Sequence, residues 1–378
     1  MKKTMLALAI AALPMVAAAQ TSQVTMYGIL DVGVGAAKMF GNNPDMKTVT
    51  RVDDNLSRWG VRGSESLGNG LNAIFQIESW ISADGTTLNG GSRAGQIGGR
   101  DTFLGLQGGF GKVRLGRLSN YQNSDMETVT PWAGQLGIGI DTLGMITRFD
   151  TRFNNAVRYD SPNLGGFDLS LLYSFDEVRA NGDNRAAWGI GAGYTLQNLF
   201  VKAGYTQYQQ QNGSGNKDGN YWRIEGGYDS TLTVIGAFQQ STQYGASATG
   251  GTNNIWMRPT GSWGAGGVGN IGTQLGTSGI FFGDNDKMKT QEAAITASYQ
   301  IGNFVPRASF GWGFDAKVNG KKLNDSGYQQ FIVGTDYVLS KRSKLFAAFG
   351  YICYDSSRFT DGRHDNEQLF QIGMLHSF

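Results

Sequence analysis

The sequence has little cysteine, little histidine and no long apolar run after its first residues. A single cysteine, Cys353, excludes an intramolecular disulfide framework. The two histidines, His364 and His376, lack the nucleophile and orienting partner that a histidine-dependent hydrolase needs. After Ala19 no apolar run reaches the roughly 18 residues of a membrane-spanning helix. We therefore expect neither an enzyme nor a helical membrane protein.

The first residues carry the pattern of a secretion signal. A positive start, Lys2-Lys3, precedes an apolar stretch, Met5 to Val16, and a small-residue cleavage site, Ala17 to Ala19. The alternative, an N-terminal anchor helix, is the weaker interpretation because the apolar stretch is short. We expect a signal peptide over residues 1–19 and one exported domain over residues 20–378.

The chain also lacks an excess of charge of either sign. It has 32 basic and 30 acidic residues, and loss of Lys2 and Lys3 with the signal leaves 30 of each. This balance argues against a nucleic-acid partner. A G-x-G-x-x-G pattern occurs at Gly264 to Gly269, but it lies in a glycine-rich stretch, Ser241 to Lys289, rather than between a strand and a helix. We interpret it as loop, and we expect neither a cofactor nor a metal.

What the sequence does contain is glycine, with 57 residues, and apolar residues at every second position. In the segment Val24 to Val34 the even positions are apolar or glycine and the odd positions are mixed, which predicts a strand with one apolar face. Sixteen such segments follow one another without a domain boundary. They are Val24–Val34, Ser57–Glu65, Leu71–Ser79, Asp101–Gln107, Gly111–Arg117, Phe149–Tyr159, Phe167–Phe175, Ala187–Thr195, Leu199–Tyr208, Tyr221–Asp229, Leu232–Gln239, Gln291–Gln300, Phe304–Phe314, Gln329–Tyr337, Leu345–Cys353 and Gln368–Phe378.

The joints between these segments alternate between tight turns and longer polar stretches. Examples of the tight turns are Gly68-Asn69-Gly70 and Leu196 to Asn198. The longest of the polar stretches is Ser241 to Lys289. Short turns at one rim and long loops at the other are typical of a transmembrane barrel. The alternative is a soluble sandwich or lectin, which would usually divide so many strands between domains. We predict an all-β fold, a 16-stranded antiparallel transmembrane β-barrel.

The same alternation predicts where arginines point. If the apolar Trp59 and Val61 face outward, Arg58 and Arg62 on the alternate positions face inward. By the same rule, outward-facing Val113 and Leu115 place Arg114 on the inward face. In the segment 149–159, an outward face of Phe149, Phe153, Val157 and Tyr159 turns Arg148, Arg152 and Arg158 inward. For any one of these arginines, a solvated charged face is an alternative. Because charge on a lipid-facing surface is costly, the grouping favours a water-filled lumen, which a barrel of this width would enclose.

Five stretches give the chain its resemblance to a known family: SQVTMYGILDVGVG near the start, LSRWGVRGSESLGNGLNAIFQIE at 56–78, RDTFLGLQGGFGKVRLGR at 100–117, RFNNAVRYDSP at 152–162 and the final LHSF. Together they resemble the Gram-negative general porins of the beta-proteobacterial type. The resemblance implies an outer-membrane homotrimer of 16-stranded barrels whose third long loop folds inward. It places Arg58, Arg100 and Arg152 in the basic half of the constriction, although Arg100 shares its strand face with Leu104 and Leu106.

The inward loop is expected from about Leu118 to Thr147. It carries Trp132 and three carboxylates, Asp125, Glu127 and Asp141. Carboxylates on this loop opposite arginines on the wall would create a transverse field across the narrowest section. The predicted basic wall consists of Arg58, Arg62, Arg100, Arg114, Arg148 and Arg152.

The last segment is predicted to close the barrel against Val24–Val34, because an open strand edge in lipid leaves backbone groups unsatisfied. Phe370, Ile372, Met374 and Phe378 would then face outer-membrane lipid or a neighbouring subunit, and the terminal phenylalanine resembles a barrel assembly signal. We expect a passive diffusion channel for small hydrophilic solutes and ions that prefers anions. A substrate-specific channel and a non-conducting structural or adhesive barrel are the alternatives.

Overall fold

The computed structural model describes residues 22–38, 47–85, 97–126, 132, 146, 150–176, 186–209, 217–244, 287–355 and 366–378. The strands are β1 Ser22–Lys38, β2 Val49–Asp54, β3 Arg58–Gly68, β4 Leu71–Trp80, β5 Thr102–Gly108, β6 Gly111–Ser119, β7 Arg152–Asp160, β8 Phe167–Ser174, β9 Ala187–Leu196, β10 Leu199–Tyr208, β11 Gly219–Tyr228, β12 Leu232–Tyr244, β13 Lys287–Tyr299, β14 Phe304–Gly313, β15 Lys317–Val318, β16 Lys321–Lys322, β17 Tyr328–Val338, β18 Ser343–Tyr354 and β19 Asn366–Ser377. One helical turn, α1 Tyr121–Ser124, follows β6. In these ranges no helix has the length and apolar character needed to cross a membrane.

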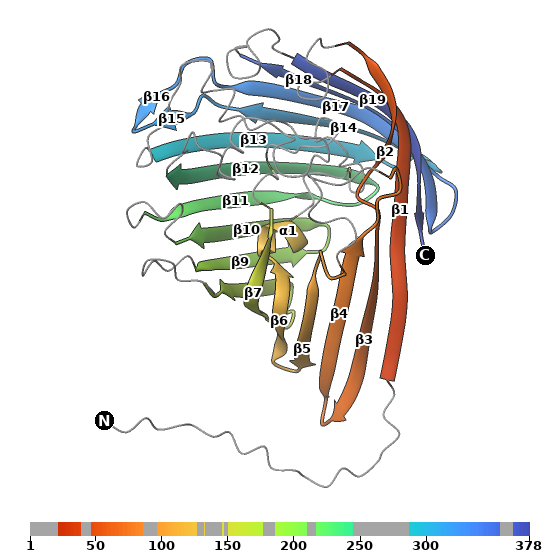
Figure 1. The fold of residues 1–378 in the computed structure, drawn as a ribbon, viewed down its shortest axis with the longest axis vertical. Helices are drawn as coiled ribbons and strands as arrows, with labels where there is room; N and C mark the ends of the chain where they lie inside the picture. The colour runs from red at the N-terminus through yellow and green to blue at the C-terminus, as the bar shows by residue number, and fades with distance from the viewer. Residues whose placement is uncertain are drawn as a thin grey trace.

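All the strands in the described ranges belong to one antiparallel sheet that closes on itself. The first strand closes it: Ile29 to Lys38 of β1 pair with β19, and Ser22 to Ile29 pair with β3. Three short strands, β2, β15 and β16, extend the sheet at its rim, and the other sixteen form the barrel. In Figure 1, β3 and β4 run steeply across the direction of β10 to β14, as opposite walls of tilted strands do. The predicted sixteen-stranded closed barrel is confirmed.

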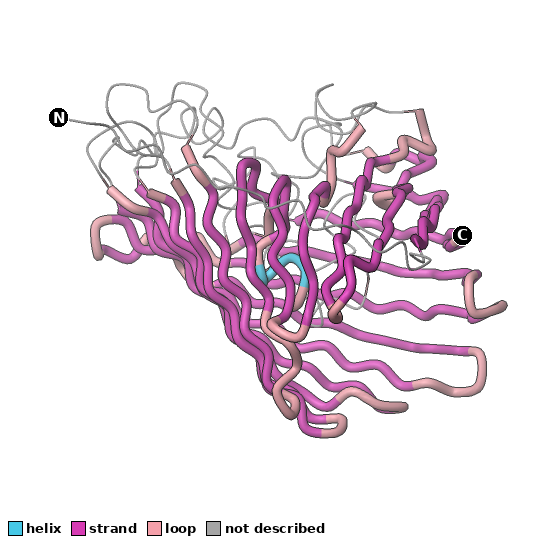
Figure 2. Tube along the Cα trace, turned by 90° about the horizontal axis from the view of Figure 1, so that it is seen from below, coloured by secondary structure: helices cyan, strands magenta, loops and turns pink. Residues whose placement is uncertain are grey.

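The tight turns fall where the sequence predicts them. Between β3 and β4, Asn69 and Gly70 have φ angles of 52° and 77°. A two-residue hairpin turn with both φ angles positive matches the right-handed twist of its strands, and asparagine followed by glycine adopts it readily. Figure 2 shows α1 inside the ring of strands, so the chain enters the lumen soon after β6 ends.

The outer face of the sheet is apolar and the inner face is polar, as in a membrane barrel and unlike a soluble protein. On β1 the outward residues Val24 and Met26 are 63% and 66% exposed, whereas the inward carboxylate Asp31 is fully buried. Arg158 and Arg223 are likewise buried on the inside. A soluble sandwich would bury the apolar face and expose the charged one. The observed arrangement therefore excludes the soluble alternative and leaves a polar interior.

One prediction of side-chain direction is wrong. Phe153 was expected to face outward, but it is buried inside the barrel in a cluster with Leu118, Leu172 and Ala187. The pairing of β6 with β7 shifts register between Gly116 and Leu118, so one extra residue of β7 is accommodated. Such a bulge reverses the inward and outward alternation beyond it.

Candidate functional site: the basic wall and the inward loop

Neighbouring strands bring the predicted arginines to one side of the lumen. Arg58 and Arg62 lie on β3, Arg114 on β6 and Arg152 on β7, while Arg100 lies two residues before β5. Because Arg100 lies before the first residue of β5, strand alternation does not govern its direction, and its contacts determine it instead.

Arg100 is held by a buried network at the end of β4. Its Nε donates to Glu78, and the other Glu78 oxygen accepts a hydrogen bond of 2.8 Å from the Tyr27 hydroxyl. The Arg100 guanidinium carbon lies 4.0 Å from the centroid of the Trp80 ring. A cation above an indole face is attracted to its negative quadrupole. Trp80 therefore serves as a platform that fixes this guanidinium.

Arg152 approaches the same platform from β7. Its Nε lies 2.5 Å from Asp101 Oδ1, and that oxygen also accepts a hydrogen bond of 2.6 Å from the Ser119 hydroxyl. The Arg152 guanidinium carbon is 5.9 Å from the centroid of the Trp80 ring. Two arginines that are distant in sequence therefore meet at one aromatic side chain.

These cations interact with one another. Burial, and then the charges of Arg152 and Arg58, lower the pKa of Arg100, although the Glu78 carboxylate opposes this shift. A guanidinium still remains protonated at neutral pH. Within the described ranges Glu78 and Asp101 pair with Arg100 and Arg152, whereas Arg58 forms no ion pair. The cluster of Arg58, Arg100 and Arg152 thus carries an excess of positive charge.

A different arginine, Arg223 on β11, anchors the two ends of the inward segment. Its Nη1 donates to Asp150 Oδ1 at 2.8 Å and to the Ile146 carbonyl at 3.2 Å, and its Nη2 donates at 2.7 Å to each of the Gln122 and Met126 carbonyls. The Arg223 side chain is fully buried. One guanidinium thus binds residues at both the start and the end of the inward segment, which is the stretch between β6 and β7.

The helical turn α1 fits against glycines on the lumen side of β9 and β10. A Cβ at Gly191 would collide with the Tyr121 ring, and a Cβ at Gly204 would lie 2.7 Å from the Gln122 side chain. The Tyr121 hydroxyl donates a hydrogen bond of 2.7 Å to Asp168. Glycine here permits a close approach that a side chain would prevent.

Trp132 provides a further contact between the inward segment and the wall. The side chain is 1% exposed and packs against Ile332 and Ala348 in a buried cluster with residues of β12 and β13. Its Nε1 donates a hydrogen bond of 2.8 Å to Ser309 Oγ on β14. The contacts of α1 therefore lie on β7 to β10 and those of Trp132 on β12 to β18, whereas the arginine cluster lies on β3 to β7.

Asp125, predicted as an acidic residue of the constriction, lies at the start of the inward segment. Its carboxylate is 2.6 Å from Arg158 Nη2, and Arg158 is also 2.7 Å from Asp160. Lys202 Nζ donates to the Asp125 backbone carbonyl. The Asp125 carboxylate is thus engaged in an ion pair with β7.

The other predicted residues separate into two groups. Phe370, Ile372, Met374 and Phe378 are 41–52% exposed on the outer face. Arg148, Glu127 and Asp141 lie outside the described residues. In the described ranges no three or more histidine, cysteine, aspartate or glutamate side chains are grouped so as to hold a metal ion.

Sequence reasoning missed Arg223, although a signal was present. In the stretch Tyr221 to Glu225 the apolar Trp222 and Ile224 alternate with Arg223, which places the arginine on the inward face. Its inward direction could thus be predicted. Its partners Gln122 and Ile146 are 101 and 77 residues away in sequence, and no local pattern identifies them.

A closed barrel with an apolar outside, a polar inside and a segment docked within the lumen defines an outer-membrane diffusion channel. The chain belongs to the Gram-negative porin family, which matches residues 6–357. It is 31% identical to the major outer membrane protein P.IB of Neisseria sicca, over 93% of this chain and 94% of that protein. It is 30% identical to P.IB of Neisseria meningitidis serogroup A over the whole of both chains. The protein is therefore an outer-membrane porin.

Solved structures share the fold. An anion-selective porin from Comamonas acidovorans superposes with a TM-score of 0.69 at 22% identity, covering 94% of this chain and all of that one. OmpF of Salmonella typhi, in complex with daunomycin, gives a TM-score of 0.62 at 15% identity, covering 94% and 97% of the two chains. At these identities the comparison concerns the fold alone.

Proposed function

We propose that this porin passes small hydrophilic solutes by passive diffusion and prefers anions. The observation that carries the anion preference is the convergence of three arginines: Arg100 and Arg152 meet at the Trp80 ring, and Arg58 pairs with Trp80 across β3 and β4. Among the described residues two carboxylates, Glu78 and Asp101, form ion pairs with them. A wall with excess positive charge raises the local concentration of anions and lowers that of cations.

The size of this effect can be bounded. A unit charge about 4 Å from a passing ion contributes about 1 kcal/mol in water, which corresponds to roughly a fivefold change in local concentration. Salt screens the interaction over about 10 Å at 0.1 M ionic strength. One uncompensated arginine charge therefore supports a preference of a few-fold that weakens as salt rises.

Two further observations support the proposal. Trp132 of the inward segment contacts β12 to β18, on the far side of the barrel from the arginine cluster on β3 to β7. The structurally similar porin from Comamonas acidovorans is described as anion-selective. In a narrowed passage a permeating ion would pass close to the arginine cluster, where the charge of the arginines acts most strongly on it.

Planar-bilayer recordings of the purified protein test the proposal. In a KCl gradient we expect steady conductance with a reversal potential displaced toward that of chloride, and a larger displacement at low salt. Displacement toward the potassium potential would refute the anion preference. Saturable block by one uncharged solute would instead indicate a substrate-specific channel, and absence of conductance would indicate a structural barrel.

We also propose that the protein is a homotrimer. The outer face along β1 and β19 carries exposed apolar side chains, with Val24, Met26, Phe370 and Ile372 each at least 48% exposed. Such a face can be covered by lipid or by a neighbouring barrel. Chemical cross-linking in detergent should yield dimers and trimers and no larger species, whereas monomers alone would refute this part of the proposal.

A further inference from the structure

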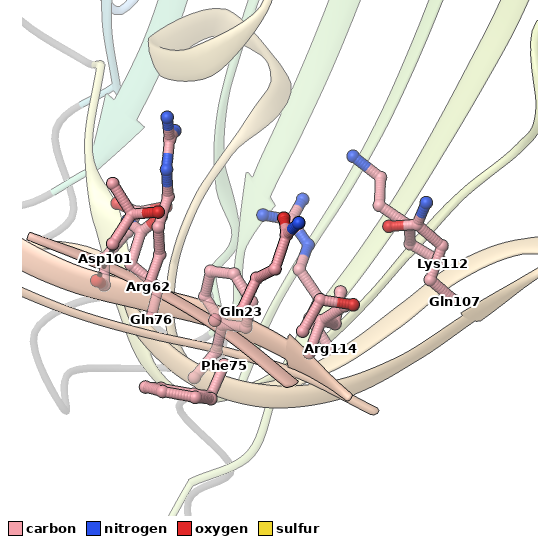
Figure 3. A pocket seen from close by; sticks show the side chains of 13 residues that line it. Gln23, Arg62, Phe75, Gln76, Asp101, Gln107, Lys112 and Arg114 are labelled. Atoms are coloured by element: carbon pink, nitrogen blue, oxygen red, sulfur yellow. Dashed lines mark hydrogen bonds between the residues drawn. The ribbon is translucent and has the colours of Figure 1, made fainter. Parts of the chain in front are cut away.

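A second basic surface lies below the arginine cluster, toward the short turns. It is a half-open cavity of about 470 Å³ between β1 and β6. In Figure 3 the side chains of Arg62, Gln23, Arg114 and Lys112 project to one side of these strands, whereas Phe75 projects to the other. We call this surface, formed by Arg62, Gln23, Gln76, Gln107, Lys112 and Arg114, the lower basic pocket.

The strand register separates the lower basic pocket from the arginine cluster. Arg62 follows Arg58 by four residues on β3, which is roughly 13 Å along a strand. Lys112 and Gln107 pair directly across β5 and β6, beside the turn that joins these strands. Because the short turns of such barrels face the periplasm, the pocket lies on the periplasmic side of the constriction.

The charge in this pocket is only partly neutralised. Arg114 lies 2.6 Å from Asp160, which balances its charge. Asp101 also borders the pocket, but it pairs with Arg152. Arg62 and Lys112 form no ion pair within the described parts of the chain, and the Arg62 guanidinium carbon lies 4.9 Å from the centroid of the Tyr27 ring. Two cationic charges are thus left to face the lumen.

The neutral side chains of the pocket are amides. Gln76 Nε2 donates to the Asp101 carbonyl at 3.3 Å, while Gln23 and Gln107 carry further amide groups into the cavity. Amide N–H groups and guanidinium groups are hydrogen-bond donors that suit the oxygens of an anion. A volume of about 470 Å³ falls within the range of small-molecule sites.

We propose that the lower basic pocket binds a doubly charged oxyanion, such as a phosphate or a dicarboxylate, after it has crossed the constriction. The inference rests on the proposed conductance and adds a binding site to it. Arg62 and Lys112 provide the two charges, and the glutamine amides provide directed donors. Occupancy of the pocket by a dianion places negative charge in the lumen and reduces the chloride current.

The experiment is block of single-channel chloride current by inorganic phosphate at pH 8, with succinate as a second probe. We expect phosphate to block more strongly, at the same concentration, when added to the compartment that faces the short turns. The double variant Arg62→Gln, Lys112→Gln should raise the half-blocking concentration at least about tenfold, since two charge-assisted contacts are lost. Stronger block by succinate than by phosphate would identify a dicarboxylate as the preferred ligand.

Two further variants sharpen this test. Lys321→Gln, Lys322→Gln also removes two cations, but on the exposed β15–β16 hairpin at the opposite rim, and should leave the block unchanged. Gln107→Glu places a negative charge in the pocket and should abolish the block. Equal block in the wild type and the Arg62, Lys112 variant, or no block of a conducting wild type, would overturn the inference. A non-conducting wild type would instead refute the proposed function.

Discussion

Replacement of Arg223 by methionine should release the inward segment from the wall. The Arg223 guanidinium contacts the Asp150 carboxylate and the carbonyls of Ile146, Gln122 and Met126. Methionine has similar length but no hydrogen-bond donor. Arg223 Nε also lies 3.8 Å from the buried Glu225 carboxylate, so the substitution leaves two carboxylates and three carbonyl groups without this partner.

The magnitude follows from the burial of this cluster. Arg223 is fully buried, and the side chain of Asp150 is 10% exposed. Removing one member of such a buried pair costs about 3–5 kcal/mol, because the remaining charge is left uncompensated. Each 1.4 kcal/mol is a factor of about ten, so the ratio of docked to undocked segment should fall by roughly two to four orders of magnitude.

Single-channel recording is the assay for this change. We expect Arg223→Met to raise the mean conductance and to add open-channel current steps, because Gln122, Met126 and Ile146 then lose their hydrogen bonds to the wall and the segment undocks more often. Arg51→Met is a control, since it also removes an arginine from an ion pair, here with Asp53 on the short strand β2. An Arg223→Met channel with the conductance and noise of the wild type would refute the anchoring role.

Two further substitutions test the other contacts of the segment. Trp132→Ala should destabilise docking of the segment by about 3–5 kcal/mol through lost packing. Trp132→Phe should cost only about 1 kcal/mol, for the lost hydrogen bond to Ser309. Equal conductance noise in the two variants would contradict a role for Trp132 packing. Gly191→Val should displace Tyr121 and increase the conductance. Gly226→Val is the control, because a Cβ at Gly226 would meet the backbone of β10 rather than the segment. A wild-type current in Gly191→Val would show that Tyr121 does not need this space.

Much of the barrel could be predicted from the sequence because strand alternation is a local property. The segment Leu199–Tyr208 agrees with β10 at both ends, and the closing strand pairs with β1 as expected. Alternation fails where the backbone is irregular, and the bulge opposite Gly116 reverses the direction of Phe153. The short strand β2 was missed because six residues, Val49–Asp54, are too few for a clear period-two pattern.

The candidate site was harder to predict than the fold. The inward direction of Arg58 follows from alternation, whereas Arg152 lies beyond the bulge in β7, and its contact with Asp101 sets its direction instead. The meeting of Arg100 and Arg152 at Trp80 depends on packing between strands that sequence spacing does not reveal. The carboxylates that neutralise part of the wall, Glu78 and Asp101, were missed for the same reason.

The proposed anion preference depends on uncompensated arginine charge on the wall. The deciding measurement is the reversal potential in a KCl gradient, compared between the wild type and Arg58→Ala, because Arg58 forms no ion pair in the described parts of the chain. We expect a chloride preference in the wild type that falls several-fold in Arg58→Ala and is unchanged in Lys321→Ala. A wild type that prefers potassium, or an Arg58→Ala channel with wild-type selectivity, would contradict it.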